Sequence, residues 1–111
     1  MVQILTRRID KTAVLDISGD IDLAHSGEVR RVVLLEIRDK KTPKVVLNMR
    51  EVNYIDSSGV ASLVEGLKAS RDMGSRLILF GLSPVTYEVF QLSRLLKVFE
   101  IVETENDALE A

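Results

Sequence analysis

The sequence predicts an α/β domain built on a mixed, mostly parallel sheet of about five strands, with about four helices. Strand-like and helix-like segments alternate in the order β-β-α-β-α-β-α-β-α, which is typical of a parallel sheet layered with helices. Residues 44–49 and 76–80 are short, continuous apolar runs, as expected of strands that are covered on both faces. The length of 111 residues fits one domain, which we expect to span residues 1–111.

The first two strands are predicted at residues 2–9 and 13–18. Ala13, Leu15 and Ile17 alternate with more polar neighbours, which is the two-residue period of a strand. Because only a short turn at residues 10–11 separates the two segments, we expect them to pair as an antiparallel hairpin.

The first helix is expected to begin after Ser26, a residue type that favours the N-cap position. Apolar residues then recur at helical spacing on one face: Val29, Val32, Val33 and Ile37. Pro43 cannot sit inside a helix, so the helix should end before it.

The second half of the chain repeats this alternation. A helix opens at about Asp56 and ends near Gly74, with Gly66 allowing it to pack closely on the sheet. Ser83 followed by proline starts the next helix, and Thr104 is placed to cap a terminal one. The last strand is expected at residues 98–102, and the aromatic side chains expected in the core are Tyr87, Phe90 and Phe99.

Composition excludes several functional classes. The 15 Lys and Arg against 17 Asp and Glu give a net charge of −2, so no nucleic-acid footprint is expected. The chain has no Cys and one His, His25, so neither a thiolate nor a histidine metal site is expected, and no cofactor is expected. We see no signal peptide and no apolar run long enough to enter a membrane, so we expect a cytoplasmic protein.

The most informative segment is Asn53-Tyr54-Ile55-Asp56-Ser57-Ser58-Gly59-Val60. It follows a predicted strand and opens a predicted helix, a position where α/β sheets carry sites and where helix N–H groups attract anions. One interpretation is capping alone, since Asp and Ser are good capping residues. The other is a hydroxyl that accepts a phosphoryl group and so changes the charge of a binding surface.

The chain resembles the STAS domain family along nearly its whole length. The resemblance lies in Gly19-Asp20-Ile21-Asp22, Val45-Val46-Leu47-Asn48 and the segment Tyr54-Ile55-Asp56-Ser57-Ser58-Gly59-Val60, continued by Gly81-Leu82-Ser83-Pro84-Val85, Val89-Phe90-Gln91-Leu92-Ser93 and Leu96-Lys97-Val98-Phe99. Within this family the chain is most like the bacterial anti-sigma factor antagonists.

This resemblance implies a protein-binding module that is switched by phosphorylation of Ser57, the hydroxyl residue directly after the aspartate. The partners implied are an anti-sigma factor serine kinase, which binds the unphosphorylated form and thereby frees its sigma factor, and a serine phosphatase. Asp56 would shape the acceptor loop, Ser58 would cap the helix, and Gly59 would let a partner approach.

Three further residues are expected to border the acceptor and contact the partner: Asp22, His25 and Tyr54. For Asp20 and Asp22 the other interpretation is turn and capping chemistry after a strand. For His25 it is a solvated or capping role.

Two other functions remain open from the sequence. Some STAS domains are adaptor subunits that dock on the ATPase of a lipid-transporting ABC system. A receiver domain phosphorylated on Asp56, with Asp20 and Asp22 holding magnesium, would need a lysine at the end of its last strand, and Lys97 precedes that strand. We expect no enzyme, because nucleotide-binding and nucleophile motifs are absent and Ser57 lacks an imidazole in its sequence neighbourhood.

Overall fold

A five-stranded mixed sheet forms the centre of the molecule, described by a computed structural model covering residues 1–111. The strands lie in chain order, β1-β2-β3-β4-β5, and only the β1–β2 pair is antiparallel. The strands are β1 (Val2–Ile9), β2 (Thr12–Ile21), β3 (Lys44–Ile55), β4 (Arg76–Phe80) and β5 (Glu100–Val102). The predicted α/β class, the element order and the antiparallel hairpin are confirmed.

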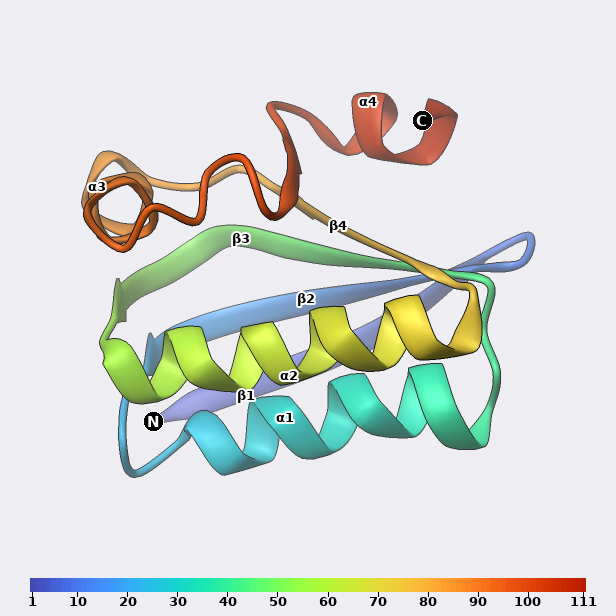
Figure 1. Cartoon of the computed structure of the whole chain (residues 1–111), viewed down its shortest axis with the longest axis horizontal. Helices are drawn as coiled ribbons and strands as arrows, with labels where there is room; N and C mark the ends of the chain where they lie inside the picture. The colour runs from blue at the N-terminus through green and yellow to red at the C-terminus, as the bar shows by residue number, and fades with distance from the viewer.

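The helices lie on both sides of the sheet (Figure 1). They are α1 (Ser26–Leu34), α2 (Ser57–Met73), α3 (Pro84–Leu92) and α4 (Glu105–Glu110), and α1 continues into a π-helical turn, η1 (Leu35–Asp39). Helices α1 and α2 lie next to each other across one face, whereas α4 covers the opposite face. Helix α3 lies at the end of the molecule where α2 begins. No helix combines the length and the apolar character needed to cross a bilayer.

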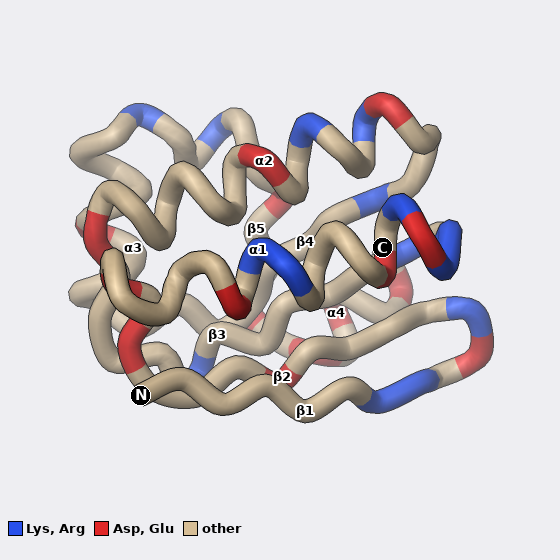
Figure 2. Tube along the Cα trace, turned by 90° about the horizontal axis from the view of Figure 1, so that it is seen from below, with Lys and Arg blue, Asp and Glu red and all other residues tan.

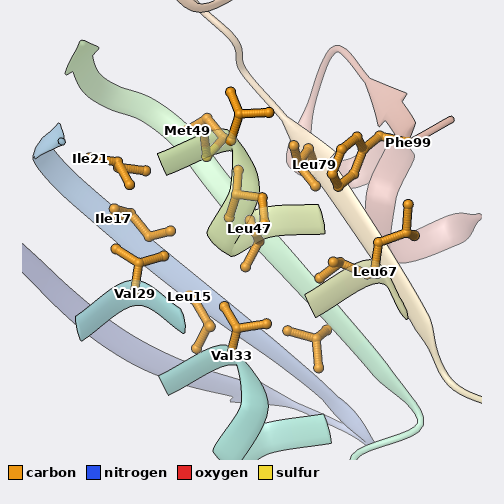
Figure 3. Packing of buried hydrophobic residues seen from close by; sticks show 14 of the residues in the cluster. Leu15, Ile17, Ile21, Val29, Val33, Leu47, Met49, Leu67, Leu79 and Phe99 are labelled. Atoms are coloured by element: carbon orange, nitrogen blue, oxygen red, sulfur yellow. The ribbon is translucent and has the colours of Figure 1, made fainter. Parts of the chain in front are cut away.

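Two apolar clusters hold these layers together. The larger one, of 19 buried residues, joins the sheet to α1 and α2 and reaches α3 through Phe90 (Figure 3). The smaller one, of five residues, lies on the other face, where Ala108 anchors α4. Gly66 packs mainly against α1 and not only on the sheet, because a Cβ there would lie 2.8 Å from Val33 Cγ1 and 3.5 Å from Leu77 Cδ2.

The third strand is longer than predicted. It continues through residues 50–55, which were expected to lead from the strand to Asp56, and most of these residues are polar and exposed. These residues pair with the end of β2 after two register shifts, so that Asp20 faces Tyr54 and Ile21 faces Ile55. The extension brings the ends of β2 and β3 together next to the start of α2.

Helix α1 begins differently from the prediction. Ser26 is buried and already helical, and His25 occupies the N-cap position without a side-chain cap. The free N–H of Ser26 is instead satisfied by the carbonyl of Asp22 at 2.7 Å. The prediction that Ser26 is the N-cap was therefore wrong, because the helix begins one residue earlier and Ser26 is its first helical residue.

Two further predictions need correction near the chain end. Tyr87 is 45% exposed and is not a core residue, whereas Phe90 and Phe99 are buried and meet edge to face at 5.4 Å. The last strand begins only at Glu100. Val98 lies in a turn instead, and its N–H donates a hydrogen bond to the Leu95 carbonyl. The predicted caps Ser83 and Thr104 are confirmed by their hydrogen bonds to the N–H groups of Thr86 and Asp107.

Candidate functional site

A single carboxylate organises the end of the sheet where α2 begins. Asp56 is the N-cap of α2, and its Oδ1 accepts hydrogen bonds from the N–H groups of Ser58 at 2.9 Å and Gly59 at 3.1 Å. Its Oδ2 accepts from the N–H of Leu23 at 3.1 Å. One side chain thus satisfies two of the free N–H groups of the helix and also fastens the β2–α1 loop, residues 22–25, to the helix start.

The two adjacent serines have different surroundings. Ser57, the first residue of α2, is exposed, whereas Ser58 is half-buried and its N–H is bound by Asp56. The expectation that Ser58 caps the helix is wrong, because the N-cap position lies two residues earlier and the Asp56 carboxylate fills that role. Of the two hydroxyl-bearing residues, Ser57 is the one presented to solvent.

Gly59 does not offer space to a partner. It is buried, and a Cβ at this position would lie 2.2 Å from the carbonyl oxygen of Ile21 and 2.6 Å from Ile55 Cγ1. The expectation that Gly59 lets a partner approach is therefore wrong. The close neighbour is the chain itself, since α2 passes tightly over the ends of β2 and β3.

Asp22 and His25 bind each other within the β2–α1 loop. Oδ1 of Asp22 lies 2.6 Å from Nδ1 of His25 and accepts from the His25 N–H at 3.1 Å. Partial desolvation raises the pKa of Asp22, but the hydrogen bond and the charge of His25 outweigh it, and the net pKa is lowered. The two side chains shape the loop next to Asp56, and both are about one-third exposed.

Two exposed apolar side chains lie near the start of α2. Leu23 is 78% exposed although its backbone is held by Asp56, and Tyr54 is 48% exposed at the end of β3. Tyr54 was predicted from the sequence as a contact residue, but Leu23 was not. An isolated leucine in a loop belongs to no helical or strand pattern, so the sequence gives no signal for it. Exposed apolar side chains on a fixed backbone are typical of contact residues. We call Asp22, Leu23, Tyr54, Asp56 and Ser57 together the Ser57 site.

The carboxylates of this region do not form a metal site. No group of three His, Asp or Glu side chains is placed to hold a metal ion. The oxygens of Asp56 face backbone N–H groups, and Asp22 is turned to His25. These groups instead build a negatively charged rim, and Figure 2 shows acidic positions near the start of α1, whereas acidic and basic positions are mixed at the opposite end of the molecule.

Comparisons with known proteins agree with this architecture. The STAS domain family matches residues 3–108. The chain is 32% identical over 92 residues to the anti-sigma-B factor antagonist of Listeria monocytogenes, which covers 82% of this chain and 79% of that protein.

Solved structures show the same fold. An anti-sigma factor antagonist from Mycobacterium paratuberculosis superimposes with a TM-score of 0.89 at 22% identity, covering 99% of this chain and 92% of the other. The Bacillus cell fate determinant SpoIIAA in its phosphorylated form gives a TM-score of 0.75 at 23% identity, covering 97% of each chain. These relatives are binding modules and not enzymes. The chain belongs to the STAS domain family, and its relatives include proteins named anti-sigma factor antagonists.

Proposed function

We propose that this protein is an anti-sigma factor antagonist that binds an anti-sigma factor serine kinase while Ser57 is unphosphorylated, and releases it once Ser57 carries a phosphoryl group. The observation that supports this function best is the exposed hydroxyl of Ser57 at the first position of α2, next to a capping carboxylate. In this proposal the kinase and a serine phosphatase perform the chemistry, and this chain only binds, in the cytoplasm.

The geometry of the Ser57 site supports Ser57 over Ser58 as the acceptor. A kinase must bring its own catalytic groups to the hydroxyl, which requires exposure that Ser57 has and that the half-buried Ser58 lacks. The backbone around Ser57 is also firmly held by the bonds of Asp56 to Leu23, Ser58 and Gly59. A rigid, exposed serine beside two exposed apolar side chains is suited both to docking and to modification.

The electrostatics of the site explain how modification would end binding. A phosphoserine adds about −1.5 to −2 charges at neutral pH. This charge would join Asp56 and Asp22 in a surface that a bound partner desolvates, and uncompensated buried charge is costly. A penalty of about 3–4 kcal/mol weakens binding by a few hundredfold, which is enough for a switch.

A pull-down with two matched baits tests the proposal. Ser57→Ala keeps the surface but cannot be phosphorylated, and Ser57→Asp places a permanent negative charge at the same position of the chain. From a lysate of the source organism, Ser57→Ala should retain an anti-sigma factor kinase, identified by mass spectrometry, and Ser57→Asp should retain far less of it. Ser58→Ala serves as the control and should bind like the unaltered chain.

Phosphorylation is checked separately with the captured kinase and ATP. The kinase should modify the unaltered chain and Ser58→Ala but not Ser57→Ala, as peptide mass mapping would show. Equal binding of the kinase by Ser57→Asp and by the unaltered chain would refute the switch.

The same experiment decides on the adaptor alternative. Recovery of the ATPase of a lipid-transporting ABC system, in place of an anti-sigma kinase, would assign the chain to that second role. The receiver-domain alternative is excluded by membership of the STAS family. In the structure, moreover, Lys97 lies ahead of β5 and Asp56 is occupied by backbone donors.

A further inference from the structure

An open cleft of about 430 Å³ lies at the carboxyl ends of β4 and β5, apart from the residues of the Ser57 site. The two strands pair in parallel up to Phe80 and Val102, so Gly81 and Glu103 follow next to each other where the pairing stops. The cleft is lined by these strand ends and by α3: Gly81, Leu82, Tyr87, Ile101, Val102 and Glu103. Ligands in open α/β sheets bind outside the carboxyl ends of the strands.

The lining combines apolar walls with one charge. Leu82, Ile101 and Val102 are half-buried and supply apolar surface, and the Tyr87 side chain beside them is 45% exposed. Glu103 is the only charged residue of the lining and is exposed. None of the ion pairs of the molecule includes Glu103, so its charge is available to a ligand.

The Arg50 side chain touches this lining, but its guanidinium group is directed elsewhere. Carbon atoms of the Arg50 side chain lie against Gly81, where a Cβ would come within 2.3 Å of Arg50 Cγ. The Arg50 guanidinium, however, lies 5.5 Å above the centroid of the Phe80 ring, and its Nε donates to Asn48 Oδ1 at 3.4 Å. Its charge acts on Asp16 and Glu105 on that side, and Arg50 forms no salt bridge with Glu103.

We propose that this cleft binds a lysine or arginine side chain presented by a partner protein. The aliphatic stem of such a side chain would cover Leu82 and Ile101, which lie on the same side of the sheet, as long basic side chains commonly do on apolar surfaces. Its cationic head would meet the Glu103 carboxylate and the Tyr87 ring, both of which attract cations. An acidic side chain would be repelled by Glu103, and a neutral one would gain nothing from it. The cleft does not require Ser57, so this inference stands apart from the proposed switch.

The test is an NMR titration of the full ¹⁵N-labelled chain with capped Gly-Lys-Gly and Gly-Arg-Gly peptides. We expect saturable amide shifts confined to residues 81–82, 87 and 101–103. A capped Gly-norleucine-Gly peptide, which has the same stem without the ammonium group, should leave these amides unshifted. Glu103→Gln should raise the dissociation constant of the lysine peptide about threefold, the size expected for an exposed ion pair. Tyr87→Leu should raise it by a similar factor through loss of the cation–π contact.

The control variant is Glu110→Gln, which removes an exposed carboxylate of α4 that does not line the cleft. It should leave both the shifts and the affinity unchanged. The proposal is overturned if no saturable shifts occur at the cleft, if the norleucine peptide produces the same shifts, or if Glu103→Gln binds the lysine peptide as tightly as the unaltered chain. Repeating the titration with Ser57→Asp should give the same affinity, which separates this outcome from that of the phosphorylation switch.

Discussion

The Ser57 site owes its shape to the two oxygens of Asp56. A serine at the same N-cap could accept from the helix N–H groups, but it has no second oxygen to hold Leu23. The carboxylate therefore links the β2–α1 loop to α2, and the loop in turn holds Leu23 outward and Asp22 against His25. The Ser57 hydroxyl, the proposed acceptor, and the residues around it are thus positioned by one residue that need not touch a partner.

A substitution at Gly59 tests how closely α2 approaches the end of β2. Gly59→Ala should destabilise the fold by about 1–3 kcal/mol, because its new methyl group would press against the Ile21 carbonyl, which cannot move without disturbing β2. The matched control is Gly27→Ala in the first turn of α1, where no atom lies within 4 Å of the added Cβ. Urea unfolding followed by circular dichroism should show a lower midpoint for Gly59→Ala only. An unchanged midpoint for Gly59→Ala would show that α2 does not approach β2 this closely.

Among the elements, the π-helical turn η1 holds a buried carboxylate that binds other segments of the chain. It places Glu36, which is only 2% exposed, where Arg8 of β1 donates to both its oxygens at 2.8 and 2.7 Å. Thr42 adds a hydrogen bond to Oε1 at 2.9 Å, and Lys40 lies 3.4 Å away. A buried carboxylate thereby joins the edge strand, the end of the first helix and the connection to β3.

This carboxylate makes the stability of the fold depend on pH. Burial raises the pKa of Glu36, but the hydrogen bonds from Arg8 and Thr42 and the positive charges of Arg8 and Lys40 outweigh it, so its folded-state pKa is below the usual glutamate value. Its stabilisation is complete above the unfolded-state pKa of about 4.3 and is lost as pH falls through the lower folded-state pKa. Glu36→Gln should cost about 1–2 kcal/mol at pH 7.

The pH dependence separates this charge effect from simple loss of packing. Urea midpoints measured between pH 7 and pH 3 should fall less steeply for Glu36→Gln than for the unaltered chain, because the variant has no carboxylate to protonate at this position. Parallel curves for the two proteins would mean that Glu36 is not held as an ion in the folded state.

In the whole molecule, Ser57, the proposed acceptor, lies outside the packed core. The main cluster lies between the sheet and helices α1 and α2 (Figure 3). Ser57, in contrast, is exposed at the first position of α2. The site can therefore change its charge without disturbing what holds the layers together. This separation is what a binding switch requires of its scaffold.

Ser57→Asp should accordingly remain folded, with a melting temperature within a few degrees of that of the unaltered chain, because negative charge is tolerated at a helix N-terminus. The matched control is Ser62→Asp on the same helix, where the serine is only 7% exposed and a buried charge should lower stability by several kcal/mol. Differential scanning calorimetry measures both. Loss of the unfolding transition of Ser57→Asp, or a melting temperature many degrees lower, would mean that phosphorylation acts by unfolding the domain.

The sequence by itself determined what depends on near neighbours in the chain. Apolar periods predicted the order of strands and helices, and short polar motifs predicted the caps at Ser83 and Thr104, because these hydrogen bonds span only three residues. The position of Ser57 at the start of a helix followed in the same way.

Tertiary structure decided everything that depends on distant segments. The tie between Asp56 and Leu23 joins residues far apart in sequence, and the crowding of Gly59 comes from β2. The polar end of β3 becomes a strand only because β2 lies beside it, and Tyr87 remains exposed because the core near α3 is filled by Phe90 and Phe99. Local patterns record which conformation a segment prefers, whereas burial and contact are set by the other segments that the fold brings against it.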